Sequence, residues 1–115
     1  MWNDTAKILS AARKFTETLR ESELYQAYRK SRIQLERYPE IAAQLKEFKQ
    51  TEAALSSRNE LSFDEERHIS HLYAELTRHP AAAAFLEREQ ALLDTYGEMM
   101  DVIDGAWEID LFESI

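Results

Sequence analysis

The sequence of 115 residues contains no cysteine and few residues that favour tight turns, with only two glycines and two prolines. The absence of cysteine excludes disulfides, thiolate metal sites, cysteine-held iron–sulfur clusters and a cysteine nucleophile. Sheet-based folds need many tight turns, which depend on glycine and proline. The scarcity of both residues argues against a sandwich, a barrel or a doubly wound fold and favours an all-α protein.

Long apolar runs are also missing. No run of about 18 apolar residues is present, so we expect no membrane-spanning helix. The start, Met1-Trp2-Asn3-Asp4, has neither the basic residues nor the apolar stretch of a signal peptide. The 44% of hydrophobic residues can form a core, and the 31% of charged residues require a solvated surface. We therefore expect one soluble, cytoplasmic domain.

Acidic residues dominate the charge, but they are unevenly placed. The formal net charge of −8 argues against binding to DNA and to anionic membrane surfaces. Residues 1–58 hold 11 Lys and Arg against 8 Asp and Glu, whereas residues 59–115 hold 3 Arg against 14 Asp and Glu. The two halves can pair within one subunit or across an interface, although chance clustering on a solvated surface gives the same counts.

Apolar residues recur at helical spacing in successive segments, and Ile8, Ala12, Phe15 and Leu19 form the first such stripe. We expect antiparallel helical hairpins, or a bundle, of about five helices with a long C-terminal helix. This helical domain covers residues 1–104, and an acidic and apolar tail follows over residues 105–115.

Local signals predict the helix boundaries. Pro39 and Pro80 each end one helix and suit the first turn of the next. Ser62 and Glu65 have the spacing of a capping box. Three further breaks are expected: a kink at residues 20–22, a polar loop at residues 56–60, and the end of the last helix before Gly105.

A weak internal repeat has a spacing of 41 residues. The segment 35–39, Leu-Glu-Arg-Tyr-Pro, aligns with the segment 76–80, Leu-Thr-Arg-His-Pro. In both halves an Ala-rich helical segment follows the proline. The repeat predicts two helical hairpins related by an approximate twofold axis, with coincidence in an Ala-, Leu- and Glu-rich chain as the alternative.

The last helix has an apolar face too wide for one neighbouring helix to cover, which predicts self-association, most simply as a dimer. In the tail, large apolar residues alternate with acidic ones, and we expect the apolar residues to pack on the same subunit or on a partner. The candidate interface residues are Phe85, Leu86, Leu92, Leu93, Tyr96, Met99, Met100, Trp107, Leu111 and Phe112.

All three histidines occur close together, in the series His68, His71, Glu75 and His79. On one continuous helix these side chains lie within a wedge of about 80°, and such a cluster could hold zinc. A solvated flank of an amphipathic helix gives the same pattern, and no other segment supplies an obvious completing ligand. We therefore expect no metal and no cofactor.

A basic cluster, Arg29-Lys30-Ser31-Arg32, lies close to Tyr25 and Tyr28 and could contact RNA phosphates and bases. A solvated helix face explains the cluster as well, so we do not expect direct RNA binding. The sequence has no Gly-x-Ser-x-Gly motif and no phosphate-binding glycine-rich loop. We expect no catalytic residues and no enzymatic activity.

Taken together, the sequence resembles the YlbF/YmcA (Com_YlbF) family of small bacterial helical proteins over residues 5–105. The residues that carry the resemblance are Ser22, Glu23, Tyr25, Tyr28, Leu35, Leu45, Phe48, Gln50, Leu76, Pro80, Phe85, Leu86, Glu89 and Leu92.

The resemblance implies a non-enzymatic regulator of competence, sporulation and biofilm formation in Gram-positive bacteria. It implies partners as well, namely paralogues that together assist the endoribonuclease RNase Y in processing transcripts. The founding members are associated with cysteine-held iron–sulfur clusters, which this cysteine-free chain does not share. We therefore expect a cytoplasmic adaptor that acts through protein–protein contacts. The alternatives are a metal-binding helical bundle and a direct RNA-binding protein.

Overall fold

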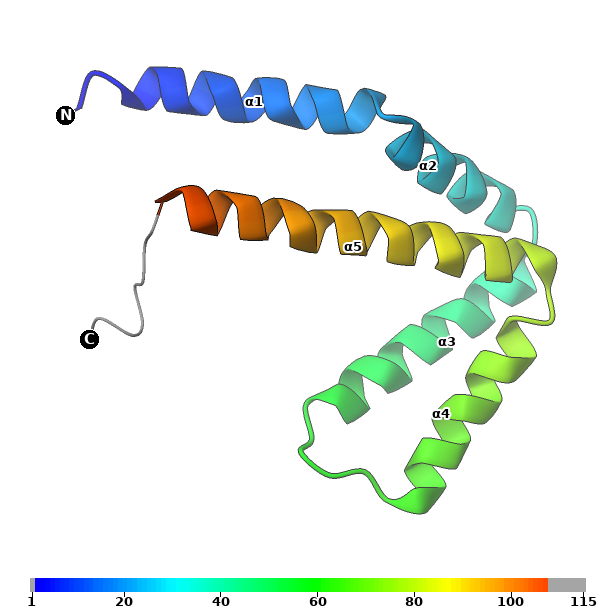
Figure 1. Cartoon of the computed structure of the whole chain (residues 1–115). Helices are drawn as coiled ribbons and strands as arrows, with labels where there is room; N and C mark the ends of the chain where they lie inside the picture. The colour runs from blue at the N-terminus through cyan, green and yellow to red at the C-terminus, as the bar shows by residue number, and fades with distance from the viewer. Residues whose placement is uncertain (1, 108–115) are drawn as a thin grey trace.

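A computed structural model describes the backbone of residues 2–107 and the side chains of residues 2–106 (Figure 1). The described chain is all-α and contains no strand, as predicted. Its five helices are α1 (Thr5–Glu21), α2 (Glu23–Leu35), α3 (Pro39–Ser56), α4 (Phe63–Leu76) and α5 (Pro80–Trp107).

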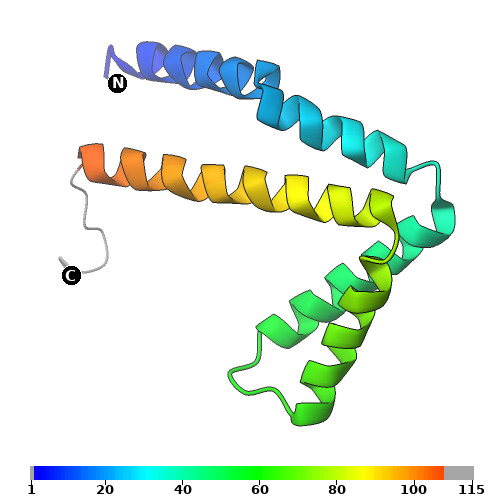
Figure 2. The same cartoon turned by 45° about the vertical axis from the view of Figure 1, so that its right-hand side comes forward.

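The helices form two layers that diverge like the arms of a V (Figures 1 and 2). One arm is the hairpin of α3 and α4, and the other contains α5 with α1 and α2 along its far side. The radius of gyration is 18.9 Å, against about 13 Å for a compact domain of this length. The single chain therefore leaves much of its helix surface uncovered.

The bend between α1 and α2 occurs at Ser22, inside the predicted kink. Ser22 has extended backbone angles, and its Oγ accepts a hydrogen bond from the Tyr25 amide at 3.1 Å. The same hydroxyl donates to the Leu19 carbonyl, so one side chain satisfies backbone groups of both helices. This local bonding explains a bend without glycine or proline.

The other predicted starts are also confirmed. Pro39 and Pro80 are the first residues of α3 and α5, where a missing amide hydrogen costs nothing. At the start of α4, Ser62 Oγ accepts from the Glu65 amide at 3.1 Å and the Glu65 carboxylate accepts from the Ser62 amide at 3.0 Å. The capping box is therefore complete.

Two predicted helix ends are wrong. Because Thr77 caps α4, that helix ends at Leu76 and does not include His79. The last helix continues through Gly105 to Trp107. A glycine ends a helix where it adopts the left-handed conformation, and Gly105 does not adopt it. The predicted packing of the Leu111 and Phe112 side chains, and that of the Trp107 side chain, lies outside the described residues.

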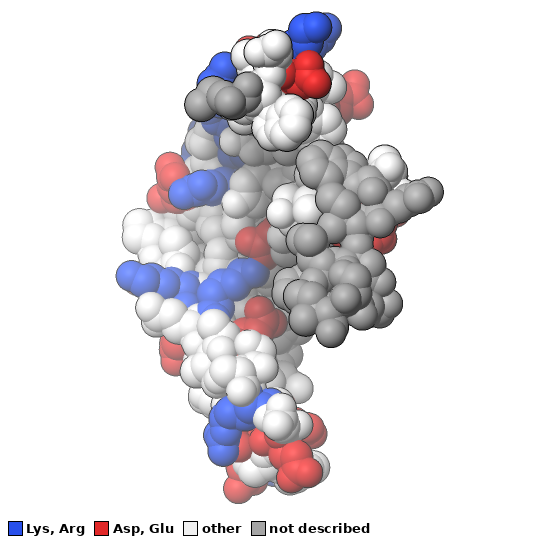
Figure 3. Space-filling model, turned by 90° about the vertical axis from the view of Figure 1, so that its left-hand side faces the viewer, with Lys and Arg blue, Asp and Glu red and all other residues white. Residues whose placement is uncertain are grey.

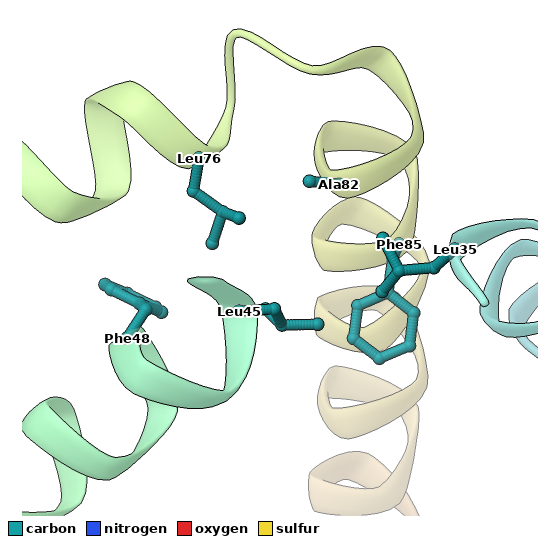
Figure 4. Close-up of a cluster of buried hydrophobic side chains, with 6 residues drawn as sticks. All are labelled: Leu35, Leu45, Phe48, Leu76, Ala82 and Phe85. Carbon is teal, nitrogen blue, oxygen red and sulfur yellow. The ribbon is translucent and has the colours of Figure 1, made fainter. Parts of the chain in front are cut away.

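The buried core lies where the two arms meet (Figure 4). Its members come from four helices, and all are less than 9% exposed: Leu35, Leu45, Phe48, Leu76, Ala82 and Phe85. Leu35 and Leu76 occupy equivalent positions of the 41-residue repeat, and both are buried. The repeat thus places matching leucines at the junction, whereas α1 contributes no buried residue.

Candidate interaction surfaces

The candidate interface residues on α5 differ widely in exposure. Phe85 is buried in the core of its own subunit. Leu93 and Tyr96 are 54% and 56% exposed. The others with described side chains are half-buried: Leu86, Leu92, Met99 and Met100. The distal half of α5 therefore keeps a large apolar surface in contact with solvent.

The two sides of α5 meet different neighbours. On one side Phe85 packs on Tyr28 of α2, with ring centroids 5.5 Å apart. Leu86 and Leu93 line a groove that also contains residues of α3 and α4. Only the first side is covered by a helix that packs closely along α5.

The groove between α5 and the hairpin has a volume of about 980 Å³. Its apolar lining combines residues of α3, α4 and α5, namely Phe48, Ile69, Tyr73, Leu86 and Leu93. Its charged lining is mainly acidic and comprises Lys49, Glu52, Glu87, Glu89 and Asp94. An apolar floor with an acidic rim suits an amphipathic, basic helix better than a small anionic ligand.

Two polar contacts organise this rim. Lys49 of α3 forms an ion pair with Glu89 of α5, and this pair joins the two arms across the groove. Gln90 donates a hydrogen bond to Asp94 at 2.8 Å. The side chains of Glu52 and Glu87 are exposed. The rim thus retains negative charge beyond the Lys49–Glu89 pair.

The second uncovered apolar surface is the stripe on α1. Ile8 is 56% exposed and Phe15 is 46% exposed. Among the described residues, α1 packs mainly against the adjacent α2. The predicted amphipathic stripe is therefore present, but the subunit does not bury it.

The four candidate metal ligands do not form one cluster. His68, His71 and Glu75 lie exposed on α4, where His71 Nε2 is 3.2 Å from Glu75 Oε1. His79 lies beyond the end of α4. Its Nδ1 accepts a hydrogen bond from the Ala81 amide at 3.2 Å, which caps α5. Within residues 2–106, no group of three or more potential ligands is arranged to hold a metal ion.

The pKa of the Glu65 carboxyl is lowered by the groups around it. The amide of Ser62 donates to the Glu65 carboxylate and is the largest cause that lowers its pKa below the ordinary value of 4.5. The Ser62 hydroxyl lowers the pKa further, and the Arg58 guanidinium, which pairs with the carboxylate, adds to the effect. These contacts fix the start of α4 and the end of its preceding loop.

The basic cluster on α2 does not present aromatic rings for stacking on RNA bases. Arg29, Lys30 and Arg37 surround a shallow hollow of about 380 Å³. Tyr25 and Tyr28 are half-buried and pack on each other, with centroids 6.3 Å apart. Figure 3 shows a different face, the left-hand side of Figure 1, and there the visible basic side chains are interspersed with acidic ones.

None of the helices in the described part of the chain is both long enough and apolar enough to cross a bilayer. Exposed apolar side chains lie along α1 and the distal half of α5, with others on α2 and α4, and they alternate with charged residues. Such surfaces are typical of contacts between amphipathic helices.

The fold and these surfaces define a small all-α protein of packed helices. Its main solvent-exposed surfaces of interest are the apolar faces of its helices. The chain belongs to the Com_YlbF family, since the family model described as control of competence regulator ComK, YlbF/YmcA, matches residues 8–106. No curated protein and no solved structure matches the chain. The family description supports a regulatory role.

The sequence analysis located the stripe on α1 but did not predict that the subunit leaves it uncovered, and it did not locate the acidic groove. The sequence contained one related signal, the unequal charge of its two halves. The basic residues of α1 belong to the first half, and the acidic residues of α5 belong to the second. The groove itself depends on the packing of α3 and α4 near α5, which no local pattern specifies.

Proposed function

We propose that this protein is a non-enzymatic adaptor that regulates its targets through protein–protein contacts. It self-associates, as a dimer, and it docks paralogues or a ribonuclease in the cytoplasm. In line with its family, its biological output is the assisted processing of transcripts by RNase Y. The absence of cysteine separates this role from iron–sulfur cluster binding.

One observation carries the proposal: the chain exposes apolar helix surface along both α1 and the distal half of α5. Phe15, Leu93 and Tyr96 are each between 46% and 56% exposed. Large apolar patches on a small protein mark interaction sites, because their exposure to water is unfavourable. A second protein surface is the natural means of covering them.

Affinity purification of the tagged protein from its source cells, after mild cross-linking, tests this proposal. We expect paralogues or a ribonuclease to be enriched, and deletion of the gene to change the processed ends of transcripts. Tyr96→Glu places a charge on the exposed apolar side of α5 and should abolish the enrichment. Thr95→Glu adds the same charge to a different side of the helix and serves as the matched control.

The proposal is wrong if the deletion leaves transcript ends unchanged and neither a paralogue nor a ribonuclease is enriched. It is also wrong if Tyr96→Glu and Thr95→Glu retain the same partners at equal yield. Circular dichroism of both variants shows whether the helices are intact.

A further inference from the structure

The first helix has the charge pattern of a segment that docks into an acidic groove. Its stripe of Ile8 and Phe15 has Lys7 and Lys14 on one side, about 100° away around the helix. Arg13 and Arg20 lie on the other side of the stripe, and all four basic side chains are exposed. The helix therefore presents an apolar stripe between two basic rows.

The groove side of α5 has a matching pattern. Leu86 and Leu93 line the groove, and Glu87 and Asp94 follow each of them by one position. Both pairs repeat after seven residues, as do the pairs on α1. Helices with matching seven-residue spacing can remain in contact along their length, because seven residues nearly complete two turns.

The α1 helix of the same subunit is not placed to use this groove. It lies on the α2 side of α5, whereas the groove lies on the side of the α3–α4 hairpin (Figures 1 and 2). The two complementary surfaces of one chain therefore face different regions of space. A second copy of the chain carries the same α1 and can supply it.

We propose that the groove between α5 and the α3–α4 hairpin receives α1 of a second copy of this chain. Ile8 and Phe15 of one copy then cover Leu86 and Leu93 of the other. Lys7 and Lys14 lie beside the row of Glu87 and Asp94. The inference rests on the proposed self-association and names the surfaces that form it.

Reciprocal exchange of α1 gives a closed, twofold dimer and not an open filament, because each copy fills the groove of the other. At 1.5 Å per residue, α1 is about 26 Å long, so each subunit contributes one extended helix contact. Two such contacts in one dimer also cover the apolar stripe that each subunit leaves exposed.

Charge reversal followed by sedimentation equilibrium tests the proposal on the full chain. Lys7→Glu with Lys14→Glu should weaken dimerisation by about tenfold or more, and Glu87→Lys with Asp94→Lys should do the same. The chain that carries all four substitutions should recover most of the lost affinity. Lys30→Glu with Lys46→Glu makes an equal charge change elsewhere and should leave the dimer intact.

Because the chain lacks cysteine, two single cysteines can report the contact directly. Ala12→Cys lies on the α1 stripe, and Gln90→Cys lies in the groove. A short bis-maleimide should join the two variants efficiently when they are mixed. A chain that carries both cysteines should form these links between subunits and not within one subunit.

The proposal is overturned if the wild-type dimer forms but neither charge reversal weakens it, a result that leaves self-association intact. Cross-links confined to a single subunit also overturn it, because α1 then occupies its own groove. A monomeric wild-type chain contradicts both this inference and the proposed self-association.

Discussion

The rings of Tyr38 and His79 meet edge to face, with centroids 4.5 Å apart and an interplanar angle of 63°. The two residues are 41 positions apart, and each directly precedes a proline that begins a helix. The two halves of the internal repeat therefore touch at equivalent residues. His79 Nδ1 also accepts a hydrogen bond from the Ala81 amide. The His79 side chain therefore contacts both the start of α5 and the other half of the repeat.

The histidines should accordingly differ in their effect on stability. Replacement of His79 by Ala removes both the ring contact and the helix cap, and we expect a loss of about 1 kcal/mol or more. The double substitution His68→Gln and His71→Gln should stay within about 0.5 kcal/mol, because both side chains are exposed. Urea unfolding measures both values, and equal losses would contradict the role given to His79.

The junction should be the part of the molecule most sensitive to cavities. Leu76 is 1% exposed and lies at the meeting point of the arms, so Leu76→Ala should lower the free energy of unfolding by about 2–5 kcal/mol. Val102 is 71% exposed, and Val102→Ala provides a control with an effect near zero. A small effect at Leu76 would show that the core lies elsewhere.

Gly105 should tolerate a side chain, because it lies inside α5 and not at its end. A Cβ atom at this position meets no atom within 4 Å, and the backbone is not left-handed. We expect Gly105→Ala to stabilise the protein by about 0.5–1 kcal/mol in thermal or urea unfolding. Destabilisation would instead indicate that Gly105 ends the helix.

The capping box at the start of α4 should depend on pH. The pKa of Glu65 is lowered in the folded protein, so the contribution of its carboxylate is present above about pH 4.5 and is lost as pH falls through the folded-state pKa. The difference in stability between the wild type and Glu65→Gln should therefore shrink in acid. Stability curves at several pH values measure this difference, and a constant gap would rule out the contribution.

The Ser62 side of the same box can be tested at neutral pH. Ser62→Ala removes the acceptor of the Glu65 amide and should cost about 1 kcal/mol. Ser57→Ala is a matched control, because the Ser57 hydroxyl donates only to the nearby Ala54 carbonyl at an exposed position. Equal losses in the free energy of unfolding for the two variants would contradict the role of Ser62 as a helix cap.

The sequence predicted the features that depend on neighbouring residues. Pro39, Pro80 and the pair Ser62 and Glu65 act through their own backbone bonds, so the helix starts were correctly placed. His79 was misplaced because helical spacing alone does not show that Thr77 caps α4. The end of α5 was misplaced because Gly105 fits a helix interior as well as a helix end.

The groove could not be predicted in the same way. Glu52 on α3 and Asp94 on α5 line one surface, although 42 positions separate them in the sequence. Their approach depends on how the hairpin packs near α5 at the Leu45 and Phe85 junction. The charge difference between the halves was compatible with paired surfaces and equally with chance clustering, and it carried no information on where such surfaces lie.

Sedimentation equilibrium of the full wild-type chain at micromolar concentration tests the central claim most directly, because the exposed apolar surfaces require a second protein surface to cover them. The account predicts a stable species of twice the 13.5 kDa chain mass. A stable monomer of 13.5 kDa over the same range of concentrations would contradict it.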